Sequence, residues 1–224
     1  AAVTVLAEAR RLLLTATSTE NDASLADAFS TVLSIADESG LESLIGDIVA
    51  NRHAIREFRR VADRLGGLEP ALRQRFGISP VETELSRAED YWPLAELSGP
   101  TFTHYIRLAL EKGGEKVRSV AEILERAMVE TDPLARARLI DSAFLTGTEN
   151  PKADSSLIAA AMTKSAPELR DAVIAAREHV IAKRDQLRIF RMYEATKAAL
   201  TLGLRLDADY EELKKRRSQL DFED

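Results

Sequence analysis

The segment that decides the fold is the end of the chain, where residues 166–224 read APELRDAVIAAREHVIAKRDQLRIFRMYEATKAALTLGLRLDADYEELKKRRSQLDFED. All seven prolines lie between residues 70 and 167, so after Pro167 only Gly203 weakens a helix. The pattern predicts either one very long helix or two helices hinged near residues 201–209. Apolar residues recur here at close to helical spacing, at Leu169, Val173, Ala176, Val180, Leu187 and Phe190.

Composition extends the helical prediction to the whole chain. The 224 residues are 45% hydrophobic but only 5% aromatic, and they are rich in Ala and Leu, which favour helices over strands. No stretch combines sustained apolar/polar alternation with a hairpin turn. We therefore expect an all-α fold, a multi-helix bundle with a long C-terminal helix or helix pair. Four Ser-x-x-Glu patterns predict capped helix starts, at Ser39, Ser79, Ser119 and Ser165.

Glycine and proline breaks divide the rest of the chain into shorter expected helices. We expect one helical domain over residues 1–224, in which residues 1–165 form a bundle and residues 166–224 form the long helix. Residues 147–154 are expected to form a loop. The shorter helices are predicted over residues 3–16, 25–39, 41–65, 69–76, 80–97, 102–112, 120–129, 133–145 and 155–162.

Several classes of site are disfavoured by what the sequence lacks. Without cysteine there is no disulfide, thiolate metal site or cysteine nucleophile. His53, His104 and His179 stand far apart, so we expect no metal site. The chain carries neither a Gly-x-x-x-x-Gly-Lys-Ser/Thr phosphate loop nor a His-Glu-x-x-His or Gly-x-Ser-x-Gly motif. We expect no catalytic residue in it.

Charge and targeting signals set further expectations. A net charge of −6 argues against a wholly basic nucleic-acid-binding surface but leaves room for a local basic face. No apolar run approaches the roughly 18 residues that a membrane span needs. The first residues, Ala1 to Thr4, contain no basic n-region of a signal peptide. We expect a cytoplasmic protein.

Arginines at helical spacing are the most informative polar residues. One group recurs every fourth residue, and a second group, near the end of the chain, has spacings of seven, four and three. Stripes of this kind can contact nucleic-acid phosphates without reading sequence. Because acidic residues interleave with both groups, a solvated helix laced with salt bridges remains the alternative interpretation. The DNA-contact candidates are Arg52, Arg56, Arg60, Arg177, Arg184, Arg188 and Arg191.

The two ends of the chain carry a family resemblance. Tyr210, Lys214 and the run Leu220 to Asp224 follow the pattern Tyr-x3-Lys-x5-Leu-Asp-Phe-Glu-Asp. This pattern resembles the segment by which UvrD/RecB-type superfamily 1 helicases re-enter their first RecA-like domain after subdomain 1B. Residues 5–11, VLAEARR, resemble the helix that follows the Thr-Ile-His-x-Phe motif in these helicases. The helix-rich middle is most similar to the AddA-type helicase–nuclease subunit.

This resemblance implies a fragment that covers the helical 1B insert of the first motor domain. It implies that the parent protein is an ATP-dependent DNA helicase–nuclease for double-strand-break repair, with ATP and Mg in the parent and no cofactor in this fragment. The implied partners are DNA at a single-stranded/duplex junction and an AddB-type subunit. No membrane partner is implied. A structural role is implied for the motif residues Tyr210, Lys214, Leu220, Asp221, Phe222 and Asp224.

Two function hypotheses follow. The first is an accessory helicase domain that contacts DNA phosphates and is not catalytic alone. The alternative is a protein–protein docking or scaffold module, which an exposed apolar stripe on residues 169–190 would favour. A free-standing enzyme is disfavoured because no nucleophile–base pair or metal-ligand set is present.

Overall fold

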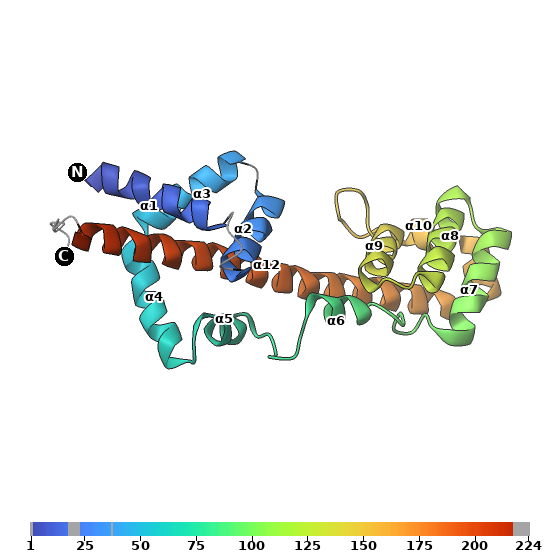
Figure 1. The fold of residues 1–224 in the computed structure, drawn as a ribbon. Coiled ribbons are helices and arrows are strands. Elements are labelled where there is room, and N and C mark those ends of the chain that lie inside the picture. The colour runs from blue at the N-terminus through green and yellow to red at the C-terminus, as the bar shows by residue number, and fades with distance from the viewer. Residues whose placement is uncertain (1, 18–22, 37, 217–224) are drawn as a thin grey trace. The chain divides into compact units, whose positions relative to one another are not determined.

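The computed structural model describes residues 2–17, 23–36 and 38–216, and it confirms the all-α prediction. Within this part of the chain every regular element is a helix, apart from one isolated antiparallel bridge between Leu145 and Pro151. The C-terminal segment forms the single long helix α12 (Glu168–Arg216), shown in Figure 1, rather than two hinged helices. Gly203 lies inside α12 and does not interrupt it.

The chain forms two compact units. Unit 1 comprises residues 1–80 and 191–224, and unit 2 comprises residues 81–190. Helix α12 contributes its first part to unit 2 and its remainder to unit 1. This division differs from the boundary at residue 165 expected from sequence, because the long helix supplies core residues to both units.

Unit 1 contains five helices besides the end of α12: α1 (Ala2–Thr17), α2 (Ala23–Ile35), α3 (Glu38–Ala50), α4 (Arg52–Arg64) and α5 (Leu68–Phe76). Its core joins Leu13, Leu25 and Ile45 from the first three helices to one face of α12. Full burial of such a side chain stabilises the fold by about 1.5–3 kcal/mol. The α12 face consists of Ala198, Leu202, Leu206, Tyr210 and Leu213, spaced three or four residues apart.

Unit 2 is built on the first part of α12. Its own helices are α6 (Glu84–Glu89), α7 (Gly99–Lys112), α8 (Glu115–Val129), α9 (Pro133–Phe144), α10 (Asp154–Leu157) and α11 (Ala160–Ser165). The predicted apolar positions of α12 are buried here, with Leu169, Val173 and Val180 fully inaccessible to solvent. The fully buried Tyr105 hydroxyl donates a hydrogen bond of 2.7 Å to the Leu157 carbonyl, which joins α7 to α10.

Several predicted helices are corrected by the structure. The helix predicted over residues 25–39 ends at Ile35, and Gly40 lies inside α3 rather than between two helices. Residues 41–65 form most of α3 and all of α4, which are separated at Asn51; the side-chain amide of Asn51 donates to the Asp47 carbonyl. Residues 80–97 contain only the short α6; Pro93 has no N–H and restricts the residue before it, which prevents continuation of the helix. Residues 155–162 fall on two short helices, α10 and α11.

The predicted capping boxes are also wrong as helix starts. Ser39 and Ser119 lie inside α3 and α8, Ser79 lies between α5 and α6, and Ser165 is the last residue of α11. The capping box found among the described residues instead pairs Thr83 with Ser86 at the start of α6. A hydroxyl three residues before a Glu is common on any exposed helix face, so the pattern alone does not locate a cap.

Candidate nucleic-acid interface

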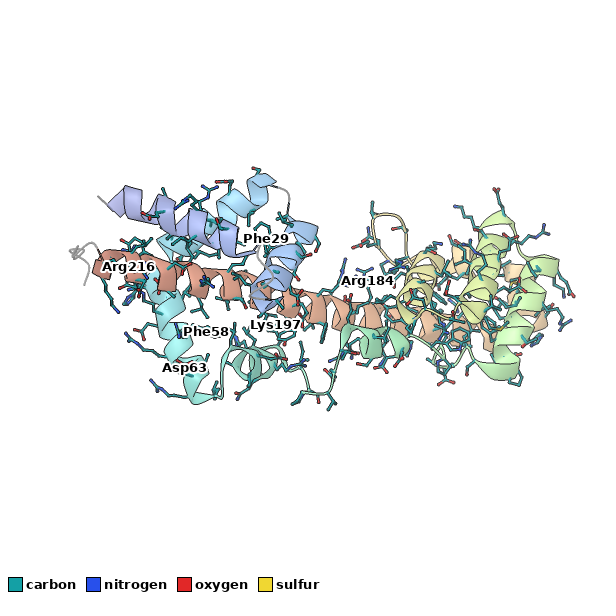
Figure 2. The ribbon with its side chains drawn as sticks, in the orientation of Figure 1. Phe29, Phe58, Asp63, Arg184, Lys197 and Arg216 are labelled. Atoms are coloured by element: carbon teal, nitrogen blue, oxygen red, sulfur yellow. The ribbon has the colours of Figure 1, made fainter. Side chains whose placement is uncertain are left out.

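Helix α4 is strongly amphipathic and carries the first arginine group. Its apolar side contains Ile55, Phe58 and Ala62, of which Ala62 is buried and Ile55 packs against the core of unit 1. Five arginines occupy the other side, together with Glu57 and Asp63. Figure 2 shows Phe58 and Asp63 on this helix. The arginines of α4 are Arg52, Arg56, Arg59, Arg60 and Arg64.

Arg56 is held by α12 rather than presented to solvent. Its Nε and Nη2 donate to both carboxylate oxygens of Asp207, at 2.8 and 2.7 Å, and its Nη2 also contacts Glu211. The hydrogen bonds to Asp207, together with both negative charges, raise the pKa of Arg56 above its usual value. Arg56 therefore joins α4 to α12, and a phosphate would have to displace two carboxylates to reach it.

Arg52 and the described part of the family motif form one cluster on the same two helices. The Arg52 guanidinium carbon lies 4.9 Å from the centre of the Tyr210 ring, and Lys214 Nζ lies 5.6 Å from it. Tyr210 and Lys214 are only 3% and 5% exposed. Tyr210 thus packs into the core beneath two cations. The remaining motif positions, Leu220, Asp221, Phe222 and Asp224, lie outside the described residues.

The other arginines of α4 are open to solvent. The Arg60 side chain is 66% exposed and contacts Glu57 at 2.5 Å, three residues earlier on the same helix. Arg59 is 56% exposed and lies 3.9 Å from Asp63, and Arg64 is also exposed. Exposed ion pairs of this kind contribute about 0.2–1 kcal/mol, so another anion can compete for these guanidinium groups.

The second arginine group lies mainly in unit 2, where Arg177 holds the segment before α10. Its Nη1 donates to the Lys152 carbonyl at 2.9 Å and to Asp154 Oδ1 at 2.8 Å, and its Nε donates to Glu178 at 3.3 Å. The hydrogen bond from Arg177 lowers the pKa of Asp154. The Arg177 side chain is only 15% exposed, and its donors are occupied by these contacts.

Arg184 and Arg188 both contact Glu149 in the loop between α9 and α10. Arg184 Nη1 donates to the Glu149 carbonyl at 2.7 Å, and Arg188 forms an ion pair with the Glu149 carboxylate. Figure 2 labels Arg184 on α12 near this loop. Arg184 is 14% exposed and Arg188 is 47% exposed. Arg191, the next member of the stripe, is exposed and belongs to unit 1.

The structure thus brings the candidates together in two separate sets. Arg52, Arg56 and Arg60 lie on α4 in unit 1, and Arg177, Arg184 and Arg188 line the 149–154 region in unit 2. Spacing along α4 could have added Arg59 and Arg64 to the first set. The distant carboxylates that hold these arginines were not found from sequence, because they come from other helices or loops: Asp207, Glu211, Glu149 and Asp154.

Metal-ligand clusters and surface depressions are the other features of the described residues that bear on ligand binding. No group of three or more His, Asp or Glu side chains in this part of the chain could hold a metal ion. A depression of about 560 Å³ between α2, α5 and α12 is lined by the carboxylates of Asp27, Glu69 and Glu194 and by one ammonium, that of Lys197. Its net negative charge disfavours a phosphate ligand. None of the described helices is both long and apolar enough to span a bilayer.

The comparisons with known proteins add no relative. No family model matches the chain, and neither a curated protein nor a solved structure is significantly similar to it.

Proposed function

We propose that the chain is an accessory helical domain of an ATP-dependent DNA helicase–nuclease for double-strand-break repair. In this role it contacts DNA phosphates without sequence specificity and is not catalytic alone. ATP and Mg act in the parent protein, and the partners are junction DNA and an AddB-type subunit. The family resemblance at the two ends of the sequence supports the parent assignment.

The observation that carries the DNA-contact proposal is the arginine side of α4. Five arginines and two acidic residues occupy this 13-residue helix, although the whole chain is acidic. Arg59, Arg60 and Arg64 are exposed there and are opposed only weakly by acidic neighbours. A phosphodiester backbone, with its dense negative charge, is the ligand that such a face attracts without reading bases.

Binding to a forked oligonucleotide tests the proposal. The chain should bind two forks of unrelated sequence equally, and the logarithm of the binding constant should fall linearly with the logarithm of salt concentration. Arg60→Gln should reduce the salt slope by about 0.9 if Arg60 neutralises one duplex phosphate.

Arg107→Gln is the matched control. Like Arg60, Arg107 is exposed, at 59%, and is paired on its own helix, with Glu111 at 3.8 Å. Both substitutions replace an arginine with glutamine, so they change the net charge equally. Equal effects of the two substitutions would show a response to net charge alone and would contradict a site on α4. Absence of binding to any fork at low salt would overturn the proposal altogether.

Protein–protein docking is the second candidate function. The apolar residues of 169–190 offer no broad docking stripe, because most of them are buried in the core of unit 2. Exposed apolar residues instead lie at the end of α8, where Met128 and Val129 are 51% and 71% exposed. If this surface binds an AddB-type subunit, Met128→Ser with Val129→Ser should abolish co-purification of that subunit while leaving binding to forked DNA unchanged.

A further inference from the structure

The loop of residues 145–151 is built so that Glu149 faces two arginines of α12. The Leu145–Pro151 bridge closes the loop. The backbone amide of Glu149 donates to the Thr146 carbonyl at 2.8 Å, and the backbone amide of Asn150 donates to the Thr146 hydroxyl at 3.1 Å. These bonds hold the loop without any contribution from the Glu149 side chain. The carboxylate can therefore leave its partners while the loop stays folded.

The backbone of Glu149 is unusual for its residue type. Its φ is +63°, in the left-handed region, and it is the sole non-glycine residue with positive φ in the described ranges. A side chain with a Cβ adopts this conformation at a cost and persists in it where surrounding contacts enforce it. The backbone of Glu149 is held by its amide hydrogen bond to Thr146 and by the hydrogen bond that Arg184 donates to the Glu149 carbonyl.

The two guanidinium groups form an anion site that one carboxylate fills incompletely. The Glu149 carboxylate forms its ion pair with Arg188, and the same oxygen lies 4.0 Å from Arg184 Nη2. Arg184 Nε is buried and has no hydrogen-bond acceptor among the described residues. A phosphate group, which offers more acceptor oxygens than a carboxylate, could pair with Arg184 Nη2 as well as with Arg188.

We propose that the Glu149 carboxylate occupies and masks a phosphate-binding position formed by Arg184 and Arg188, so that a nucleic-acid phosphate binds there only when Glu149 is neutralised. The inference rests on the proposed function, because Arg184 and Arg188 would supply a second set of DNA-phosphate contacts besides those of α4. Glu149 thereby lowers the affinity of unit 2 for nucleic acid. While Glu149 is paired with Arg188, this arginine contributes little to nucleic-acid binding, and it contributes fully once Glu149 is neutralised.

The test is a double-mutant cycle on the whole chain with the same forked oligonucleotide. Glu149→Gln should tighten binding by about fivefold and increase the salt slope by about 0.9, because one further phosphate is neutralised. Glu178→Gln is the control, since it makes the same change in charge and removes a partner of Arg177, which Asp154 still holds. Arg188→Gln should alter wild-type binding little but should cancel the gain in Glu149→Gln.

The binding data distinguish failure of the masking by Glu149 from failure of the proposed DNA contact. If the wild type binds the fork and Glu149→Gln matches Glu178→Gln, the masking by Glu149 is refuted while DNA contact through α4 stands. If neither the wild type nor Glu149→Gln binds, both the masking and the proposed function fail. Tighter binding by Glu149→Gln that survives Arg188→Gln would also overturn the inference, because the gain would then not pass through this arginine. Thermal unfolding of each variant checks that it is folded.

Discussion

At the residue scale, the arginines of this chain serve two different purposes. Arg56 and Arg177 have low exposure and several partners from distant segments, so they fix helices and loops in place. Arg59 and Arg60 have high exposure and weak partners on their own helix, so they remain able to bind another anion. Helical spacing selects both kinds alike, whereas burial and the identity of the partner separate them.

Removal of Arg56 tests its structural role. Arg56→Gln leaves Asp207, which is 13% exposed, with little compensation, and should lower the free energy of unfolding by about 1–3 kcal/mol. Adding Asp207→Asn should recover part of this loss, because the uncompensated charge is removed. Urea denaturation of the single and double variants measures both effects. A loss no larger than that of the exposed control Arg107→Gln would show that Arg56 contributes no more than a surface ion pair.

Tyr105 gives a prediction on stability and pH. Tyr105→Phe removes the hydrogen bond to the buried Leu157 carbonyl and should cost about 1–2 kcal/mol. Burial also raises the pKa of the Tyr105 hydroxyl. Its neutral form is thus favoured in the fold, so this contribution is complete below the usual tyrosine pKa of about 10 and declines as pH rises above it.

Denaturation measured between neutral and alkaline pH checks this sign. The wild type should lose more stability than Tyr105→Phe as pH rises, because only the wild type has a hydroxyl at this position to ionise on unfolding. Parallel pH profiles for the two proteins would contradict the assignment.

At the element scale, α12 packs closely against α3 at Gly203. A Cβ placed on Gly203 would lie 3.3–3.5 Å from the side chain of the buried Ile48 on α3. We expect Gly203→Val to destabilise the protein by about 1–3 kcal/mol through overpacking. Gly203→Ala should be near neutral, since its better helix propensity of about 1 kcal/mol offsets the tight contact.

A compensating substitution makes this prediction specific. Ile48→Ala alone should cost about 2–5 kcal/mol, but combined with Gly203→Val it should cost less than the sum of the two, because it removes the Cγ1 and Cγ2 atoms that the new side chain would meet. Thermal denaturation of the four proteins in the cycle measures the coupling. Strict additivity would show that α3 does not pack on α12 at Gly203.

The elements also show what the sequence could and could not predict. The periodic apolar residues Val173 and Val180 predicted a helical face, and both are buried as expected. The break at Asn51 was missed because the apolar pattern continues across it. The contact between Glu149 and Arg188 joins residues 39 positions apart, and no local spacing encodes such a pair.

At the scale of the whole molecule, the described residues form two hydrophobic cores. The core of unit 2 is drawn entirely from residues 88–187, and that of unit 1 from residues 9–48 and 198–213. We therefore expect residues 81–190 to fold alone into a helical protein with a cooperative melting transition. Circular dichroism and amide NMR dispersion of this segment measure its folding. A segment without a melting transition would show that unit 2 requires unit 1.

We propose that the chain contacts DNA through phosphate-binding arginines on α4. The salt dependence of fork binding, measured for the wild type, Arg60→Gln and Arg107→Gln, tests this contact. We predict that the wild type and Arg107→Gln share one slope and that Arg60→Gln has a slope shallower by about 0.9. A slope near zero for the wild type, or the same slope for all three proteins, would contradict the claim.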